Sequence, residues 1–329
     1  MPAKSQISSM ALLAAFASCA WIAPASAQKL EKVTVATSVE TIDALVPQFG
    51  TQEGIFAKHG IELNFIKGAN GPAMIAAVAG NSADVTHVGA ALIFPAIEKG
   101  ASMTVLSGNY DIDYTFISRK EMKIDPSKPY TEEVKKLQGK RVGVASRGGA
   151  TEVMLRRILS QAGMNAEKDV TMIAIGTGVG SAGAFINDQV DAMISIPPSD
   201  ILIGAANYDR VVDLKATQTQ VFDPNYLFTI FTASSDFVSN RPKLAENFCK
   251  AVRETMDFIQ SKESEPKLTA YIGKTLNLKP EQASEVVATY KKNFNMKLTR
   301  DRWESMKTYT PFVPDWSKHT FDPCLKIAS

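Results

Sequence analysis

Two similar series of short β-rich segments constrain the fold of this chain more than any other feature of its sequence. The first series covers residues 33–37, 61–66, 84–88 and 103–107, and the second covers 141–145, 170–175, 191–196 and 211–214. Each segment of the second series begins 107 to 109 residues after its counterpart in the first. Segments with helical periodicity separate the predicted strands. This spacing predicts an α/β fold with two similar lobes, each built from βαβ units with parallel strands.

Two further segments connect the predicted lobes. Residues 114–118 leave the first lobe and residues 225–232 leave the second, so the chain crosses between the lobes twice. Residues 233–329 have prolines at helix boundaries and no third series of strands, which predicts a helical tail that packs on the first lobe. We therefore expect a discontinuous first lobe, 28–118 plus 228–329, and an inserted second lobe, 119–227.

The first 27 residues have the pattern of an export signal. A single basic residue, Lys4, precedes the apolar run 10–17, and Ala25-Ser26-Ala27 forms an A-x-A cleavage site. We predict cleavage after Ala27 and a periplasmic protein. The alternatives are an uncleaved amino-terminal anchor and a lipoprotein attached through Cys19. No later apolar stretch reaches about 20 residues, the length that spans a bilayer.

The composition excludes several classes of protein. With 45% hydrophobic and 21% charged residues, the chain has enough apolar material for a globular core. Thirty-six basic and 34 acidic residues give a formal net charge of +2. That balance offers no general attraction to a phosphate backbone, so we expect no nucleic-acid partner.

The cysteines allow two interpretations. In an oxidising compartment Cys249 and Cys324 can form a disulfide. Cys249 also lies in an apolar helical series, where it fits equally well as a small buried residue. Neither cysteine has a His or a second Cys at metal-ligand spacing, so we predict no metal site.

Two local motifs resemble those of a known family. Residues 52–63 read QEGIFAKHGIEL, and residues 80–90 contain GNSADV followed by HVGA. In this order they resemble the nitrate, sulfonate and taurine binding proteins of ABC importers, which share a domain with thiamine-pyrimidine precursor proteins. The resemblance implies the type II periplasmic binding fold, in which two crossing strands join the lobes around a ligand cleft. It also implies a monomer that needs no cofactor and delivers a small solute to an inner-membrane permease with its ATPase.

The candidate ligand-binding residues follow the carboxyl ends of the predicted strands, where open α/β sheets bind ligands. Glycines there let backbone N–H groups approach a ligand, and each loop opens a helix whose positive end favours an anion. Arg147 adds a guanidinium that can bind a carboxylate or sulfonate through two hydrogen bonds. The predicted residues are Thr37, Ser38, Val39, Gly68, Asn70, Gly71, Gly89 and Ala90 in the first lobe, and Ser146, Arg147, Gly148, Gly149, Ala150, Thr151, Thr177 and Ser195 in the second.

This chemistry suits a small anionic solute of the sulfonate, carboxylate or nitrate class, with a neutral pyrimidine-like heterocycle as the alternative. Near the crossings, Tyr110, Tyr114 and Tyr226 are expected to fill the hinge rather than to flank a ligand. His59 is expected to stabilise a helix end, and His87 to be buried in a strand.

An enzyme is the competing class of function. Related pyrimidine-precursor synthases carry adjacent cysteines, which this chain lacks, and no G-x-S-x-G motif indicates a hydrolase. None of the three histidines has a Ser or Cys partner in the sequence. We therefore predict a binding protein without catalytic residues. A sensor partner that presents its solute to a membrane receptor is a further alternative, because it uses the same cleft.

Overall fold

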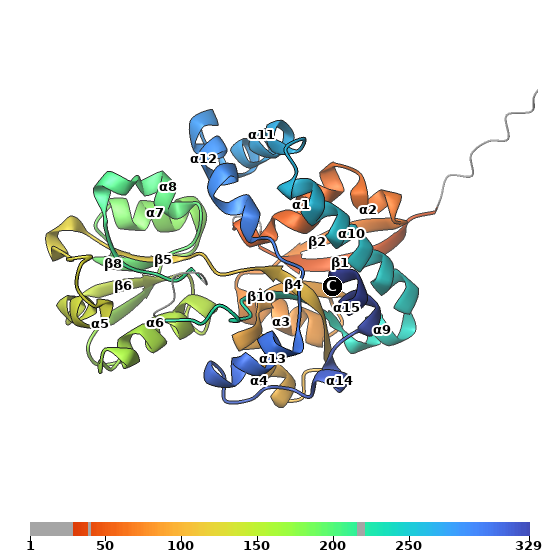
Figure 1. Ribbon diagram of the computed structural model, residues 1–329, viewed down its shortest axis with the longest axis horizontal. Helices are drawn as coiled ribbons and strands as arrows, with labels where there is room; N and C mark the ends of the chain where they lie inside the picture. Colours follow the sequence, from red (N-terminus) through yellow and green to blue (C-terminus); the bar gives the residue numbers. More distant parts are fainter. Residues whose placement is uncertain (1–28, 39–40, 216–220) are drawn as a thin grey trace, which may run out of the picture.

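The fold consists of two five-stranded sheets in two lobes (Figure 1). The computed structural model describes residues 29–38, 41–215 and 221–329, so the predicted signal peptide, its cleavage site and Val39 lie outside the described residues. The first sheet has the order β2-β1-β3-β10-β4, formed by β1 (Glu31–Thr37), β2 (Ile61–Lys67), β3 (Val85–Gly89), β4 (Met103–Tyr110) and β10 (Thr229–Ser234). The second has the order β7-β6-β8-β5-β9, formed by β5 (Thr115–Ser118), β6 (Arg141–Val144), β7 (Thr171–Ala174), β8 (Ala192–Ser195) and β9 (Asp209–Asp213).

The two sheets have equivalent topologies, as the repeated spacing predicts. In the first sheet β1 pairs in parallel with β2 and β3, and in the second β6 pairs in parallel with β7 and β8. A strand from a crossing then joins each sheet in antiparallel orientation: β10 lies between β3 and β4, and β5 lies between β8 and β9. The eight strands of the predicted series are all present, with ends within three residues of the predicted ones.

One predicted boundary is wrong. We placed residues 114–118 in the first lobe, but Thr115–Ser118 form β5 of the second sheet. The physical reason is backbone pairing: β5 is the strand partner of β9, so the second sheet is incomplete without it. The first crossing is therefore the short segment 111–114. The return boundary lies beside Thr229, where β10 begins.

Helices follow the parallel strands of both lobes. They are α3 (Gly71–Ala79) after β2, α4 (Ala90–Glu98) after β3, α6 (Ala150–Gln161) after β6 and α7 (Gly178–Ile186) after β7. The sequence specifies the start of α3 clearly, because the Asn70 side chain accepts a hydrogen bond from the backbone N–H of Ala73, and Pro72 lies in the first turn. The smaller elements are η1 (Ile42–Ala44), α1 (Leu45–Gln52), α2 (Ile55–Lys58), η2 (Lys120–Met122), α5 (Tyr130–Glu133), η3 (Val134–Leu137), α8 (Ser199–Ile203) and η4 (Ala205–Asn207).

The carboxy-terminal tail is helical and packs mainly on the first lobe (Figure 1). Cys249 of α10 and Cys324 of α15 form a disulfide, which decides between the two interpretations of these cysteines. One end of the tail reaches the second lobe, where Tyr290 of α12 donates a hydrogen bond to Asp200 of α8 at 2.5 Å. The tail elements are α9 (Ser235–Asn240), α10 (Pro242–Gln260), α11 (Glu265–Leu276), α12 (Pro280–Tyr290), η5 (Lys291–Asn293), α13 (Arg300–Ser305), η6 (Met306–Thr308), α14 (Trp316–His319) and α15 (Asp322–Ala328).

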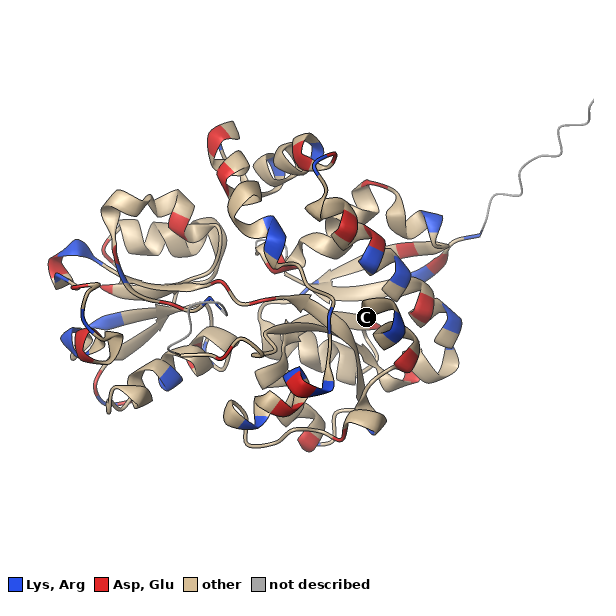
Figure 2. Ribbon diagram, viewed as in Figure 1, with Lys and Arg blue, Asp and Glu red and all other residues tan. Residues whose placement is uncertain are grey.

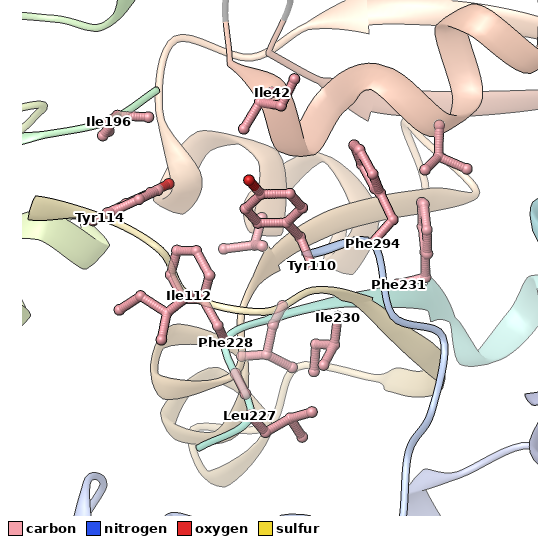
Figure 3. Close-up of a cluster of buried hydrophobic side chains, with 14 of the residues drawn as sticks. Ile42, Tyr110, Ile112, Tyr114, Ile196, Leu227, Phe228, Ile230, Phe231 and Phe294 are labelled. Atoms are coloured by element: carbon pink, nitrogen blue, oxygen red, sulfur yellow. The ribbon is translucent and has the colours of Figure 1, made fainter. Parts of the chain in front are cut away.

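Aromatic side chains fill the space where the two crossings meet (Figure 3). The ring of Tyr114, from the first crossing, makes an edge contact with Phe228, from the second, at a centroid distance of 4.9 Å. Tyr110 at the end of β4 packs on Phe294 of the tail at 5.0 Å. Tyr226 is buried as well. Tyr110 and Tyr226 thus fill the hinge region as predicted, whereas Tyr114 also lines the cavity described below.

A buried acid lies in the first crossing. Asp113 is 3% exposed; it accepts a hydrogen bond from the Tyr110 hydroxyl at 2.8 Å and another from the side chain of Asn293. Burial raises the pKa of Asp113 to about 8, against the lowering effect of the Tyr110 hydrogen bond. The crossing, the first sheet and the tail are therefore joined through one carboxyl group.

Candidate functional site

A cavity of about 340 Å³ lies between the lobes and is lined by both of them and by both crossings. Its size is that of a site for a small organic molecule. The first lobe contributes residues that follow β1, β2 and β3, and the second contributes residues that follow β6, β7 and β8. Ten predicted residues are in the lining: Ser38, Gly68, Asn70, Gly71, Gly89, Ser146, Gly149, Ala150, Thr151 and Thr177.

Four helices begin beside this cavity. The first residues of α3 and α6 line it, α4 begins directly after Gly89, and α7 begins directly after Thr177. The first N–H groups of a helix have no partner within the helix, and together with the helix dipole they attract negative charge. The topology therefore directs positive helix ends from both lobes at one small volume.

Three predicted residues are buried beside the cavity instead of lining it. Thr37 is fully buried and interacts with His87, and its neighbour Ser38 lines the cavity. Ser195 is 1% exposed, and its neighbour Ile196 lines the cavity in its place. Both cases reflect the alternation of side chains along a strand. Ala90 is buried at the start of α4, where its backbone N–H donates to the carbonyl of Phe228.

The structure differs most from the sequence prediction at Arg147. Its guanidinium pairs with carboxylates, and the residue is not in the cavity lining. Its Nε lies 3.0 Å from the carboxylate of Glu152 and its Nη2 lies 3.7 Å from Glu167. Gly148 is also absent from the lining, and its N–H donates to the same Glu152 carboxylate. Burial opposes ionisation of Glu152, but Arg156 and these neighbours outweigh it and lower its pKa. Glu152, in the first turn of α6, thus pairs with the guanidinium of Arg147 that we expected to bind the solute.

The cavity wall also contains an acid and a histidine that the sequence prediction did not place there. Asp43 lies in the short helix η1 and is 9% exposed, and His87 lies in β3 and is 1% exposed. The Oδ2 atom of Asp43 is 3.8 Å from Nδ1 of His87. Burial opposes ionisation of Asp43, but His87 outweighs it and lowers the pKa of this carboxyl. The burial of His87 was predicted. An acid in a short irregular helix gives no signal in the sequence.

The rest of the wall is largely apolar. Met74 and Leu92 contribute from the first lobe, Ile196 from the second, and the rings of Tyr114 and Phe228 from the crossings. Acidic and basic residues are intermixed over both lobes (Figure 2), so the charge at the cavity is set by nearby groups and not by one charged face. The wall can therefore hold an organic body and bind its polar ends selectively.

Within the described ranges, no group of three or more His, Cys, Asp or Glu residues is arranged to hold a metal ion. The helices of the same ranges include none that is both long and apolar enough to cross a bilayer.

The fold recurs in solved structures. A protein of Bordetella bronchiseptica RB50 is 20% identical, with a TM-score of 0.72 over 90% of this chain and 96% of that one. The alkanesulfonate-binding protein SsuA of Xanthomonas axonopodis pv. citri, bound to MOPS, is 12% identical, with a TM-score of 0.68 over 88% and 98% of the two chains. The periplasmic nitrate-binding protein NrtA of Synechocystis PCC 6803 is 16% identical, with a TM-score of 0.63 over 77% and 69%.

Sequence comparison adds the family. A Brucella abortus (strain 2308) protein named "Putative binding protein BAB2_1146" is 26% identical over 217 residues, which cover 65% of this chain and 62% of the relative. The match thus spans less than two thirds of that relative's length. The family model described as "NMT1/THI5 like" matches residues 49–265. The chain has the two-lobed periplasmic binding protein fold, and it belongs to the NMT1/THI5-like family.

Proposed function

We propose that this protein is an exported solute-binding protein, without catalytic activity, that captures a small organic solute between its lobes and delivers it to an ABC importer. The observation that carries the proposal is the cavity that both lobes line, with helix starts directed at it from each side. The export pattern of residues 1–27 and the periplasmic proteins that share the fold support the location.

An acidic group is the best partner for the helix ends. Because Arg147 pairs with Glu152, a sulfonate or carboxylate is held here by backbone N–H groups and by the hydroxyls of Ser146 and Thr177. The apolar wall accommodates the remaining organic part of the solute. A single small anion is compatible with the nearly neutral charge of the whole chain.

Closure of the lobes explains capture and release. Only a closed state places the helix ends of both lobes against the same solute, so the solute stabilises that state. The crossings bend at 111–114 and in the segment before Thr229, because β5 and β10 are fixed within the sheets. The edge contact between Tyr114 and Phe228 keeps the crossings together during this motion.

The chemistry of the wall favours binding over catalysis. The hydroxyl of Thr37 donates to the carbonyl of Ser38 at 2.8 Å, so it is not an activated nucleophile for His87. A fixed wall with polar groups at both ends is what selective retention of a solute requires.

A solute screen with scattering tests the proposal. Residues 28–329 are screened by thermal shift against sulfonates, carboxylates, nitrate and neutral nitrogen heterocycles. A true solute at 100 times its Kd adds about 2.7 kcal/mol to the free energy of unfolding. It should also make the molecule more compact in solution scattering. Failure of every solute to stabilise the protein, or an unchanged scattering profile with a stabilising solute, contradicts the proposal.

A further inference from the structure

The first-lobe wall of the cavity contains two buried polar atoms without hydrogen-bond partners in the described ranges. Asp43 and His87 both line the cavity, and the side chain of Asp43 keeps 12% of its surface exposed there. Within the described part of the chain, Asp43 Oδ1 and His87 Nδ1 are buried without a hydrogen-bond partner. Buried polar atoms without partners are rare, because their lost hydration is not replaced. The wall therefore lacks a component that would satisfy these atoms.

The hydrogen bonds of Thr37 determine which nitrogen of His87 carries a proton. The Thr37 hydroxyl donates to the carbonyl of Ser38, so its oxygen accepts from Nε2 of His87 at 2.7 Å. Nε2 therefore carries a proton. Nδ1 lies 3.8 Å from Asp43 Oδ2, which is beyond hydrogen-bond distance. The other carboxylate oxygen of Asp43, Oδ1, is an acceptor at the wall without a donor among the described residues.

The remaining neighbours of Asp43 leave room for a donor. Thr41 contributes one side-chain hydrogen bond to the carboxylate, and its hydroxyl is shared with Ser38 at 2.7 Å. His87 is fixed by Thr37 on one side and by the ring of Phe231 on the other. None of these contacts supplies a donor to Asp43 Oδ1.

We propose that the solute carries an N–H donor, an amine, amide or amino-substituted ring, and that this group donates to the Asp43 carboxylate. The inference rests on the proposed function and adds to it the chemistry at the solute's second end. The acidic group faces the helix starts, and the N–H group faces the first-lobe wall. Oxyanions without an N–H group, such as nitrate, leave the Asp43 carboxylate unsatisfied and next to another negative charge.

Matched pairs of probes test this inference. We would measure Kd by calorimetry for 4-aminobenzoate with benzoate, and for 4-aminobenzenesulfonate with benzenesulfonate, which differ only in the N–H group. The solutes that stabilise the protein in the thermal-shift screen are compared in the same way, with and without an N–H group. In the native protein the N–H members should bind about 10- to 100-fold more tightly, as expected for a hydrogen bond to a charged group.

The variant Asp43→Asn replaces an acceptor with a donor at nearly constant shape. It should remove the preference for the N–H member, because the N–H group loses its charged acceptor and the member without it no longer lies beside a negative charge. Asp301→Asn is the matched control, because it makes the same change at an exposed position of α13. If Asp43→Asn does not fold, as judged by its melting transition, Asp43→Ser takes its place.

The outcomes separate the two proposals. Equal binding of N–H members and their partners, a preference that survives in Asp43→Asn, or binding only of solutes without N–H groups overturns the inference and leaves the proposed function standing. If no solute of either kind binds, the proposed function fails and the inference fails with it. Loss of the preference in Asp43→Asn but not in Asp301→Asn establishes the contact.

Discussion

The two lobes share a topology, but they present different chemistry to the cavity. The first lobe lines it with the titratable side chains Asp43, His87 and Lys67. The described lining residues of the second lobe are uncharged: Ala145, Ser146, Gly149, Ala150, Thr151, Gly176, Thr177 and Ile196. The repeat therefore preserves strand order and helix direction but not side chains. We infer that the first lobe selects the solute and that the second covers it with hydroxyl and backbone groups.

The lobes also differ in how they are held together. The first is braced by the tail and its disulfide, whereas the second is a continuous segment attached through two short crossings.

The largest expected effect is on the pH dependence of stability, and it comes from Asp113 in the first crossing. The pKa of buried Asp113 is raised from 3.8 to about 8, so between these pH values the native protein binds more protons than the unfolded chain. The contribution of this carboxyl is fully present below about pH 4, and it falls by up to about 1.4 kcal/mol per pH unit as the pH rises towards 8. Asp113→Asn should remove this dependence.

Urea unfolding between pH 5 and pH 9 measures the effect. The stability of Asp113→Asn relative to the native protein should increase with pH and level off above about pH 8. Exposed Asp301→Asn should show a constant difference. Parallel pH profiles for Asp113→Asn and the native protein would rule out a raised pKa for the buried acid of the first crossing.

The disulfide should account for a large part of the bracing of the first lobe. Cys324→Ser opens a link between residues 75 positions apart and should lower the free energy of unfolding by about 2 to 4 kcal/mol. Solute affinity should stay within about twofold, because α10 and α15 are absent from the cavity lining. Denaturant unfolding of the variant and of the native protein, each with and without reductant, checks this. A reductant effect on the variant as large as that on the native protein would contradict it.

Closure of the lobes depends on the space between them at the cavity. A Cβ atom added at Gly89 would lie 3.8 Å from the Cβ of Ala150 in the opposite lobe. Gly89→Leu should therefore obstruct the closed state and weaken solute binding by about 30- to 100-fold, the equivalent of overpacking by 2 to 3 kcal/mol. Calorimetry and scattering measure both effects.

The matched control is Gly183→Leu, since a Cβ there meets open space on α7. It should bind solute like the native protein. Full affinity and normal closure in Gly89→Leu would mean that the lobes do not close at this contact.

The smallest changes in stability and in solute affinity are expected for Arg147→Ala. Its side chain is 47% exposed and paired with Glu152, which keeps Arg156 as a partner at 2.6 Å. Stability should change by less than about 1 kcal/mol, as for other exposed ion pairs, and affinity should stay within about twofold. A loss of binding of tenfold or more would mean that the second lobe also contributes a cation to the site, so that the two lobes would not differ in charge at the cavity.

The sequence predicts the strands and the cavity loops well, because both follow from periodicity and from glycine positions. Ten of the predicted residues line the cavity, since loops after parallel strands must meet at one edge of each sheet. Family and fold were also recognised from short motifs, and the comparisons confirm them. That these residues bind a solute stays a prediction.

The errors arise where a residue's role depends on a partner that only the folded chain supplies. Arg147 has the right chemistry for an anion, but Glu152 in the first turn of α6 pairs with its guanidinium. Residues 114–118 were predicted as a crossing segment of the first lobe, but Thr115–Ser118 form a strand of the second. The sequence could not show this, because the pairing with β8 and β9 is not local in sequence. Asp43 was missed because its importance comes from His87, 44 positions away.

The interleaved strand order also has a consequence for how the chain is completed during synthesis and export. In the first sheet β4 has only β10 as a strand neighbour, so it stays unpaired until residues 229–234 are available. Every strand of the second sheet lies between residues 115 and 213 and is available earlier. The inserted lobe can therefore fold while the enclosing lobe is still open at its edge. The first lobe, which we expect to select the solute, is then completed last, after the inserted second lobe has folded.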